Sequence, residues 1–206
     1  MNELDFSALL VSRVCHDLVS PLGAVVNGLE VLEDERDATM RADALRIVGS
    51  SAAQALARIQ FMRIAFGAAG SAGAELDLGE IGRLVAGLFS DSKITLEWGA
   101  ANAHWPKDWA KLLMNATLLG ADCLPRGGVV TVSTGDAGAA PSFKIHAASP
   151  HARILPEVEN AVRGDANSNQ PDARGVQPFL THKLARSLNA GLTLTAGAGF
   201  VELVAG

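Results

Sequence analysis

The stretch SRVCHDLVSPLGAVVNGLEVL, residues 12–32, combines a helical apolar repeat with a proline and an off-stripe histidine. Its apolar positions recur at steps of three and four residues, the repeat of a helix that packs against other helices. Pro21 falls within this repeat, whereas His16 lies beside the apolar stripe and directly before Asp17. The stretch therefore predicts a long helix, from about Asp5 to Glu33, that carries a histidine on its polar side.

A second apolar repeat follows the polar turn EDERDAT, residues 33–39, and predicts a helix from about Thr39 to Phe66. Two long helices joined by a short turn form an antiparallel hairpin. One hairpin has too little surface to cover both apolar stripes, and a second copy would complete a four-helix bundle. We therefore expect a homodimer. The stripes comprise Val11, Val14, Leu18, Pro21 or Leu22, Val25, Leu29 and Leu32 on the first helix, and Leu45, Val48, Ala52, Ala55, Ile59, Met62 and Phe66 on the second.

After the hairpin, the run GAAGSAGAE, residues 67–75, is rich in small residues and indicates a hinge. We divide the chain into a helical hairpin, residues 1–70, and a second domain, residues 75–206. Helix and strand patterns without strict alternation indicate a two-layer α+β sandwich. The polar segment 163–175 is predicted as a surface loop. The predicted helices are Leu78–Phe89, Lys107–Cys123, Leu155–Arg163 and Pro178–Asn189, and the predicted strands are Ile94–Trp98, Val129–Ser133, Phe143–Ala147, Leu192–Thr195 and Phe200–Val204.

The composition fits a folded protein and excludes several classes of function. The chain has 206 residues, of which 49% are hydrophobic, and a formal net charge of −5. It has no basic patch with interleaved aromatic residues, so we expect no nucleic-acid partner. No cationic segment precedes an apolar run at the start, and no uninterrupted apolar stretch approaches the roughly 18 residues of a membrane span, so we expect a cytoplasmic protein. Cys15 and Cys123 show no motif spacing and fit reduced thiols, although a disulfide between them stays open.

The residues that share the helical face of His16 lie three, four and seven positions away, and further turns along. They are small or polar apart from one leucine, which predicts an accessible imidazole beside a shallow surface. Such a surface suits docking of another protein's active site. An ordinary solvent-exposed histidine is the alternative interpretation. The predicted docking residues are Leu9, Ser12, Gly23, Ala24 and Asn27, and Arg13 and Ser20 lie on the same face.

Two other chemistries fail on helical geometry. Cys15, His16 and Asp17 have the residue types of a nucleophile, a base and an orienting acid, but adjacent helix positions diverge by about 100°, so we expect no hydrogen-bonded triad. A metal site needs a second ligand three or four residues from the histidine. The residues at those positions, Ser12, Arg13, Val19 and Ser20, are weak ligands.

The segment HDLVSPL, residues 16–22, resembles the phosphoacceptor box of histidine kinases. In this resemblance His16 matches the phosphoacceptor, Asp17 the adjacent acid, Ser20 the small polar residue and Pro21 the proline. Asp17 is then expected to orient the imidazole and accept its ring proton, while Ser20 packs or bonds to the backbone. Arg13 is expected to steady phosphoryl oxygens or pair with a partner, or else to be a solvated basic residue. Because Pro21 cannot donate a backbone hydrogen bond to Asp17, we expect a bend or bulge there.

Residues 112–132, LLMNATLLGADCLPRGGVVTV, resemble the asparagine box of the Bergerat-type α/β sandwich that binds ATP in the same kinases. Asn115 matches the first asparagine, and Pro125 and the following glycines keep register. Leu119 replaces the asparagine that holds Mg²⁺, and leucine cannot ligate a cation that demands oxygen. Asp122 replaces a lysine. In the strand that follows, Ala147 or its neighbour replaces the aspartate that reads adenine, and the glycine ladder near Gly175 is missing. The resemblance thus implies a degenerate ATP-binding domain and no cofactor in this chain.

Over nearly its whole length the chain is similar to the ChpT-type histidine phosphotransferases of alphaproteobacteria. The similarity includes CHDLVSPLGAVVNGLE, residues 15–30, LPRGG, residues 124–128, and VQPF, residues 176–179. It implies a dimeric relay protein that takes a phosphoryl group from the receiver domain of a hybrid kinase and passes it to response-regulator receivers, which bring the Mg²⁺. In the best-known branch the partners are CckA upstream and CtrA and CpdR downstream, in cell-cycle control.

Two alternatives stay open. An active ATP-dependent histidine kinase is disfavoured by Leu119 and by the missing aspartate. A non-catalytic dimeric scaffold that binds receivers is separated from a phosphotransferase only by phosphorylation of His16.

Overall fold

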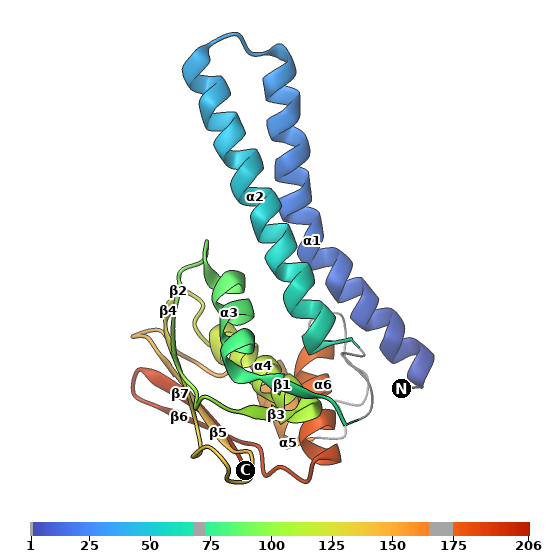
Figure 1. Ribbon diagram of the computed structural model, residues 1–206, viewed down its shortest axis with the longest axis vertical. Coiled ribbons are helices and arrows are strands. Elements are labelled where there is room, and N and C mark those ends of the chain that lie inside the picture. The colour runs from blue at the N-terminus through green and yellow to red at the C-terminus, as the bar shows by residue number, and fades with distance from the viewer. Residues whose placement is uncertain (1, 68–72, 165–174) are drawn as a thin grey trace.

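The computed structural model describes residues 2–67, 73–164 and 175–206. It begins with a hairpin of two long helices, α1 (Glu3–Asp34) and α2 (Ala38–Ala65), as Figure 1 shows. The side chain of Asn2 caps α1 by accepting from the amide of Asp5, and Asp37 caps α2 in the same way. The predicted hairpin is therefore confirmed, with α1 starting two residues earlier than the apolar repeat alone indicated.

Close packing between the two helices depends on small residues at their contact. A Cβ on Gly28 of α1 would lie 2.6 Å from Cγ2 of Val48 on α2, and Ala44 beside it is buried. Pro21 is buried on the same side of α1, and the helix continues through it without a break. Of the expected bend or bulge, the bulge is absent, whereas α1 does change direction along its length in Figure 1, so that its N-terminal part leans away from α2.

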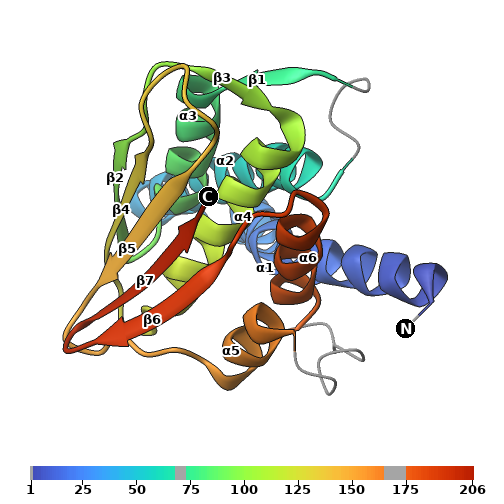
Figure 2. The ribbon, with the colours of Figure 1, turned by 90° about the horizontal axis from the view of Figure 1, so that it is seen from below.

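The second domain contains a five-stranded sheet with helices on one face (Figure 2). The strand order is β2-β4-β5-β7-β6, in which β2 runs parallel to β4 and the other neighbours are antiparallel. A small two-stranded sheet pairs β1 with β3. The elements are β1 (Glu75–Asp77), α3 (Leu78–Phe89), β2 (Ile94–Gly99), β3 (His104–Pro106), α4 (Lys107–Asp122), β4 (Gly128–Thr134), β5 (Phe143–Ala148), α5 (Pro156–Arg163), α6 (Val176–Ser187), β6 (Thr193–Gly197) and β7 (Phe200–Ala205).

This architecture confirms the predicted α+β sandwich, and α3 has the predicted bounds. The sequence missed β1 and β3, and it placed α6 two residues too late. Parts of the predicted hinge and of the predicted loop 163–175 lie outside the described residues. Helix α4 packs closely on the sheet, because a Cβ on Gly120 would approach Cγ2 of Ile145 to 2.9 Å.

The base of the hairpin belongs to the core of the second domain. Phe61, Met62 and Ala65 of α2 are buried in the same apolar cluster as the helices of the sandwich. At the other helix, the ring of Phe6 meets that of Phe179 on α6 edge to face, at 5.8 Å between centroids. The two parts of the chain are therefore packed together rather than merely linked.

A buried polar network also joins the hairpin to the sandwich. The Nδ2 of Asn115 on α4 donates to the backbone oxygens of Ala65, the last residue of α2, and of Lys111, each at 2.9 Å. The Nε2 of Gln177 on α6 donates to the backbone and side-chain oxygens of Asn115 at 3.0 and 3.2 Å. Both amide side chains are buried. The residue that matches the kinase asparagine box thus connects α2, α4 and α6.

We expect Asn115→Leu to lower the free energy of unfolding by about 3 kcal/mol, because it leaves the buried Gln177 amide and the Ala65 carbonyl short of partners. Thermal or urea denaturation followed by circular dichroism measures the loss. The exposed residue Asn102 provides the control, since Asn102→Leu should change stability by no more than about 0.5 kcal/mol. Equal stabilities of the two variants would contradict a structural role for this network.

Both cysteines are free thiols in the structure. Cys15 is exposed, whereas Cys123 is buried, and burial raises the pKa of its thiol to about 11. The Cys123 thiol therefore stays protonated and unreactive at neutral pH. The disulfide that the sequence left open is not formed.

By length and composition, α1 is the one helix of the described chain that could cross a membrane. The sequence expectation considered only uninterrupted apolar stretches. Helix α1 is apolar on average over a membrane-spanning length, although charged residues interrupt it. Such evidence is weak for a single helix, because a helix that packs its apolar side against protein passes the same test. Many of the exposed apolar residues of α1, among them Val11, Leu22 and Leu29, lie on the side away from Arg13 and His16.

Candidate functional site

His16 is presented to solvent by α1, with 82% of its side chain exposed. Its Nδ1 lies 3.1 Å from Oδ1 of Asp17. Because a carboxylate only accepts, a neutral imidazole that makes this hydrogen bond carries its proton on Nδ1, which leaves the lone pair of Nε2 unshared. Asp17 therefore contacts the imidazole, as the resemblance implied, and it does so within a continuous helix.

Asp17 is held from two further directions. Its Oδ2 accepts from Nε of Arg13, one turn earlier on α1, at 2.8 Å. Its backbone oxygen accepts from Nη1 of Arg58 on α2 at 3.0 Å. Only 14% of the Asp17 side chain is exposed, so the carboxylate beside His16 is fixed and partly shielded from water.

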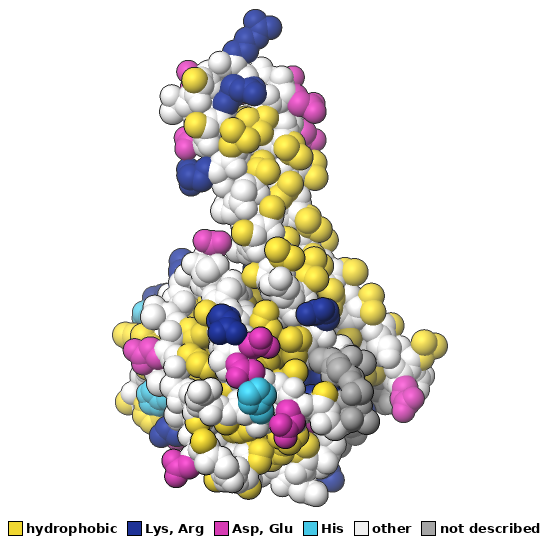
Figure 3. Space-filling model, viewed as in Figure 1, with side chains coloured by type: hydrophobic (Ala, Val, Ile, Leu, Met, Phe, Trp, Pro, Cys, Tyr) yellow, Lys and Arg dark blue, Asp and Glu magenta, His cyan; other side chains and the backbone are white. Residues whose placement is uncertain are grey.

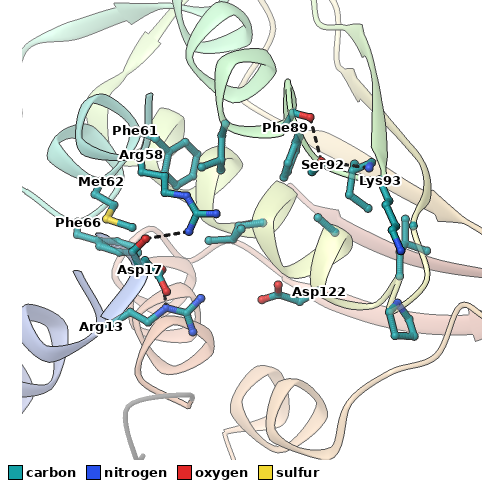
Figure 4. Close-up of a pocket in the computed structure, with 17 residues that line it drawn as sticks. Arg13, Asp17, Arg58, Phe61, Met62, Phe66, Phe89, Ser92, Lys93 and Asp122 are labelled. Atoms are coloured by element: carbon teal, nitrogen blue, oxygen red, sulfur yellow. Dashed lines mark hydrogen bonds and ion pairs between the residues drawn. The ribbon is translucent and has the colours of Figure 1, made fainter. Parts of the chain in front are cut away.

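A pocket of about 330 Å³ lies beside this group, between the hairpin and the second domain (Figure 4). Arg13, Asp17 and Arg58 form one side of it, and Lys93 lies across from them, with Asp122 between. The remaining lining residues are apolar or small: Phe61, Met62, Phe66, Leu88, Phe89, Ser92, Ile94, Leu118, Ala121, Leu124, Pro125 and Gly127. Arg13 and Arg58 thus lie next to Asp17, which contacts His16, and Lys93 faces them across the pocket.

The predicted docking residues divide into two groups along α1. Ala24 and Asn27 line an open groove of about 410 Å³ between the upper halves of α1 and α2. Val31 on α1 and Met40 and Ile47 on α2 complete its apolar surface; Gly28, Asp43 and Ala44 also line it. We call this the upper groove. Asn27 lies three helical turns from His16 on the same face, so the groove and the imidazole share one side of the hairpin.

The other predicted site residues lie outside the upper groove. Leu9 is half-buried and Ser12 is exposed, both toward the N-terminal end of α1. A Cβ on Gly23 would have open space around it. Ser20 is exposed and makes no hydrogen bond within the described part of the chain, so it has no polar contact with His16 there.

The side of the hairpin opposite its polar face carries exposed apolar residues along its length, and Figure 3 shows hydrophobic side chains following the hairpin. An apolar groove of about 350 Å³ opens near the base, between Val11 and Val14 of α1 and Ile59 of α2. We call this surface the apolar face. Its exposed members are Val11, Leu22, Val26, Leu29, Leu45, Leu56 and Ile59.

The residues that replace the nucleotide contacts of kinases are part of the core. Leu119 and Ala147 are both fully buried in the apolar cluster between α4 and the sheet. Asp122 instead lines the pocket beside Arg13 and Arg58. Across the residues that the structure describes, no group of three or more His, Cys, Asp or Glu side chains could hold a metal ion.

Sequence reasoning missed Arg58 and the α2 side of the upper groove. Met40 and Ile47 are apolar residues off the α2 stripe, and this departure from the repeat was a usable signal. Arg58 is not part of a recognisable motif. The signal for it was indirect: Pro21 has no N–H, so a carbonyl on the facing helix needs a donor from elsewhere.

Comparison with known proteins identifies close relatives. Residues 78–199 match the model of the histidine phosphotransferase C-terminal domain. The protein phosphotransferase ChpT of Brucella abortus is 39% identical over 198 residues, which cover 96% of this chain and 93% of that protein. A solved bacterial phosphotransferase is 36% identical and superposes with a TM-score of 0.90 over 100% of this chain and 98% of its own. A histidine kinase domain from Erythrobacter litoralis reaches a TM-score of 0.46 at 16% identity, over 89% of this chain and 94% of its own.

Proposed function

The chain belongs to the histidine phosphotransferase family, and we propose that it relays a phosphoryl group between receiver domains through phosphohistidine at His16, without ATP. The observation that carries this proposal is the exposed imidazole of His16, whose Nδ1 contacts the Asp17 carboxylate. The proposal is tested by incubating the chain with a phosphorylated receiver, as described in the Discussion.

In the proposed reaction, Nε2 of His16 attacks the phosphorus of a receiver's aspartyl phosphate. The bond from phosphorus to the carboxyl oxygen breaks, and its electron pair leaves with the aspartate. The ring gains positive charge, which the Asp17 carboxylate at Nδ1 stabilises. Transfer to a second receiver is the reverse of this step, with that receiver's aspartate as the nucleophile.

Phosphoryl transfer depends mainly on positioning and charge neutralisation. Arg13 holds Asp17 through Nε, and the rest of its guanidinium can pair with a phosphoryl oxygen or with an acidic group of the receiver. The receiver's own acidic residues would supply the Mg²⁺. Ser20 has no assigned chemical step in this proposal.

We assign the upper groove to the docking of a receiver. Asn27 lies 11 residues beyond His16, about 16 Å along the helix. A domain that places its aspartyl phosphate at His16 therefore also covers the groove, and the apolar lining suits an amphipathic helix of that domain. Leu9, Ser12 and Gly23 then form the margins of the same contact. The partners would be receivers of a hybrid kinase and of response regulators, of the CckA, CtrA and CpdR type.

We predict that Ala24→Phe weakens receiver binding about tenfold or more, because a large ring fills the upper groove. Calorimetry with an unphosphorylated receiver measures the dissociation constant. The transfer rate at saturating receiver should change much less than the affinity, because Ala24 does not contact His16. Ala139→Phe, on an exposed turn of the second domain, is the matched control. Wild-type affinity for the Ala24 variant would remove the groove from the docking surface.

The apolar face supports a cytoplasmic homodimer. Its exposed side chains occur on both helices of the hairpin, so two copies packed face to face would bury both stripes in a four-helix bundle. The same contact accounts for the apolar character of α1 without a membrane.

Independence from ATP is supported by the buried positions of Leu119 and Ala147, which place apolar side chains where kinases use oxygen ligands. A non-catalytic scaffold differs from a phosphotransferase in one observable property, the phosphorylation of His16. By resemblance, the relay would serve cell-cycle control.

A further inference from the structure

Pro21 leaves one backbone carbonyl of α1 without its helical donor. In an α-helix the carbonyl of residue 17 accepts from the amide of residue 21, and proline has no N–H. The affected carbonyl belongs to Asp17, the residue that contacts the ring of the phosphoacceptor. A carbonyl shielded from water without a donor is unfavourable, so this position requires a substitute.

Arg58 supplies that substitute from the facing helix. Its Nη1 donates to the oxygen of Asp17 at 3.0 Å, and Figure 4 shows the guanidinium reaching from α2 toward α1. The Nε of Arg58 is buried and has no hydrogen-bond partner in the described part of the chain, so the side chain is not held there by a competing network. Within the described residues, the guanidinium of Arg58 therefore makes its hydrogen bond to the Asp17 carbonyl.

The contact lies in a chain of interactions that ends at the reacting ring. Arg58 fixes the backbone of Asp17, and Arg13 fixes one carboxylate oxygen of Asp17 at 2.8 Å. The other carboxylate oxygen then faces Nδ1 of His16. Loss of the Arg58 contact frees the Asp17 carbonyl to turn toward water and displaces the carboxylate that selects the ring tautomer.

We propose that Arg58 is a positioning residue for the phosphotransfer: it replaces the peptide N–H that Pro21 removes, and thereby holds Asp17 against His16 so that Nε2 is the free nucleophile. This inference rests on the proposed function and extends it to a residue 41 positions away from Asp17. It also gives Pro21 a role: because the proline removes a backbone donor from α1, the position of Asp17 depends on a side chain of α2.

The test uses the full-length chain and four variants. Arg58→Met removes the donor, Arg58→Lys keeps a cationic donor, Pro21→Ala restores the peptide N–H, and the double variant combines Pro21→Ala with Arg58→Met. Single-turnover transfer from a phosphorylated receiver gives the rate at saturation and the half-saturating concentration. Arg58→Met should lower the saturated rate about ten- to hundredfold with little change in half-saturation. Arg58→Lys should retain an intermediate rate, and the double variant should be faster than Arg58→Met.

A second readout does not depend on the transfer reaction. Nitrogen-15 spectra of the imidazole of His16 in the unphosphorylated protein should show mainly the Nδ1–H tautomer in the wild type. Arg58→Met should shift the population toward Nε2–H, and the double variant should restore it. Arg83→Met, an exposed arginine on α3, is the control for loss of a surface charge.

The two readouts separate the inference from the proposed function. A wild-type protein that never accepts phosphate would refute the function, while the tautomer spectra would still decide whether Arg58 positions His16. Wild-type rate and tautomer in Arg58→Met would overturn the inference. A double variant no better than folded Arg58→Met would also overturn it, because the restored N–H would then not replace Arg58.

Discussion

His16→Gln is expected to abolish phosphoryl transfer, lowering the rate by at least about 10⁴-fold. Glutamine keeps a polar side chain but has no ring nitrogen that can form a phosphoramidate. The other four histidines lie in the second domain, away from the hairpin. Their polar partners are Asp77 for His104, Glu202 for His146, Arg126 for His151 and the Val162 carbonyl for His182.

The same variant should keep its stability, its dimer and its affinity for receivers. An exposed polar substitution changes the free energy of unfolding by no more than about 0.5 kcal/mol. His104→Gln, at another exposed histidine, should relay phosphate at the wild-type rate. If His16→Gln keeps full relay while His182→Gln loses it, both the assignment of the site and the kinase-like interpretation of α1 are wrong.

Leu29→Asp should dissociate the proposed homodimer, raising its dissociation constant about a thousandfold or more. Leu29 lies on the apolar face and is 48% exposed in the single chain. A two-fold interface would contain the substitution twice, so it would bury two carboxylates without partners. Light scattering at micromolar concentrations measures the change from dimer to monomer.

The control places the same charge on an apolar residue elsewhere. Val204 is also exposed and lies on β7, far along the chain from the hairpin, so Val204→Asp should leave the dimer intact. Because Leu29 is not part of the protomer core, the monomeric variant should retain its helical content. A wild-type monomer, or a Leu29→Asp variant that remains a dimer, would refute the assignment of the apolar face.

The long helices could be predicted from sequence because their repeats extend over many turns. Asp77 precedes α3 as its N-cap, which helps to explain why that helix was predicted with its observed bounds. The β1 and β3 strands have three residues each, too few for an alternating pattern to be recognised. The start of α6 was placed two residues too late because the helix begins directly after Gly175, whereas the prediction began it at the proline at 178.

The candidate site shows the same division between local and distant information. His16, Asp17 and Arg13 lie within one turn of each other, so a short motif specifies their meeting. The roles of Arg58 and Asn115 depend on how α2 packs against α1 and α4, which no single segment determines. Asn115 matches a catalytic box in sequence, yet in the structure it is buried and bonded to the end of the hairpin.

The central claim is that phosphate passes through His16, and it is tested by incubating the chain with a receiver that carries labelled aspartyl phosphate, in Mg²⁺ and without ATP. The account predicts an acid-labile, alkali-stable label on the chain, located at His16 by mass spectrometry, that moves to a second receiver when one is added. Incubation with labelled Mg-ATP alone should leave the chain unlabelled. Labelling from ATP would indicate a kinase, and a chain that binds the phosphorylated receiver but never carries the label, or carries it at another residue, would contradict the account.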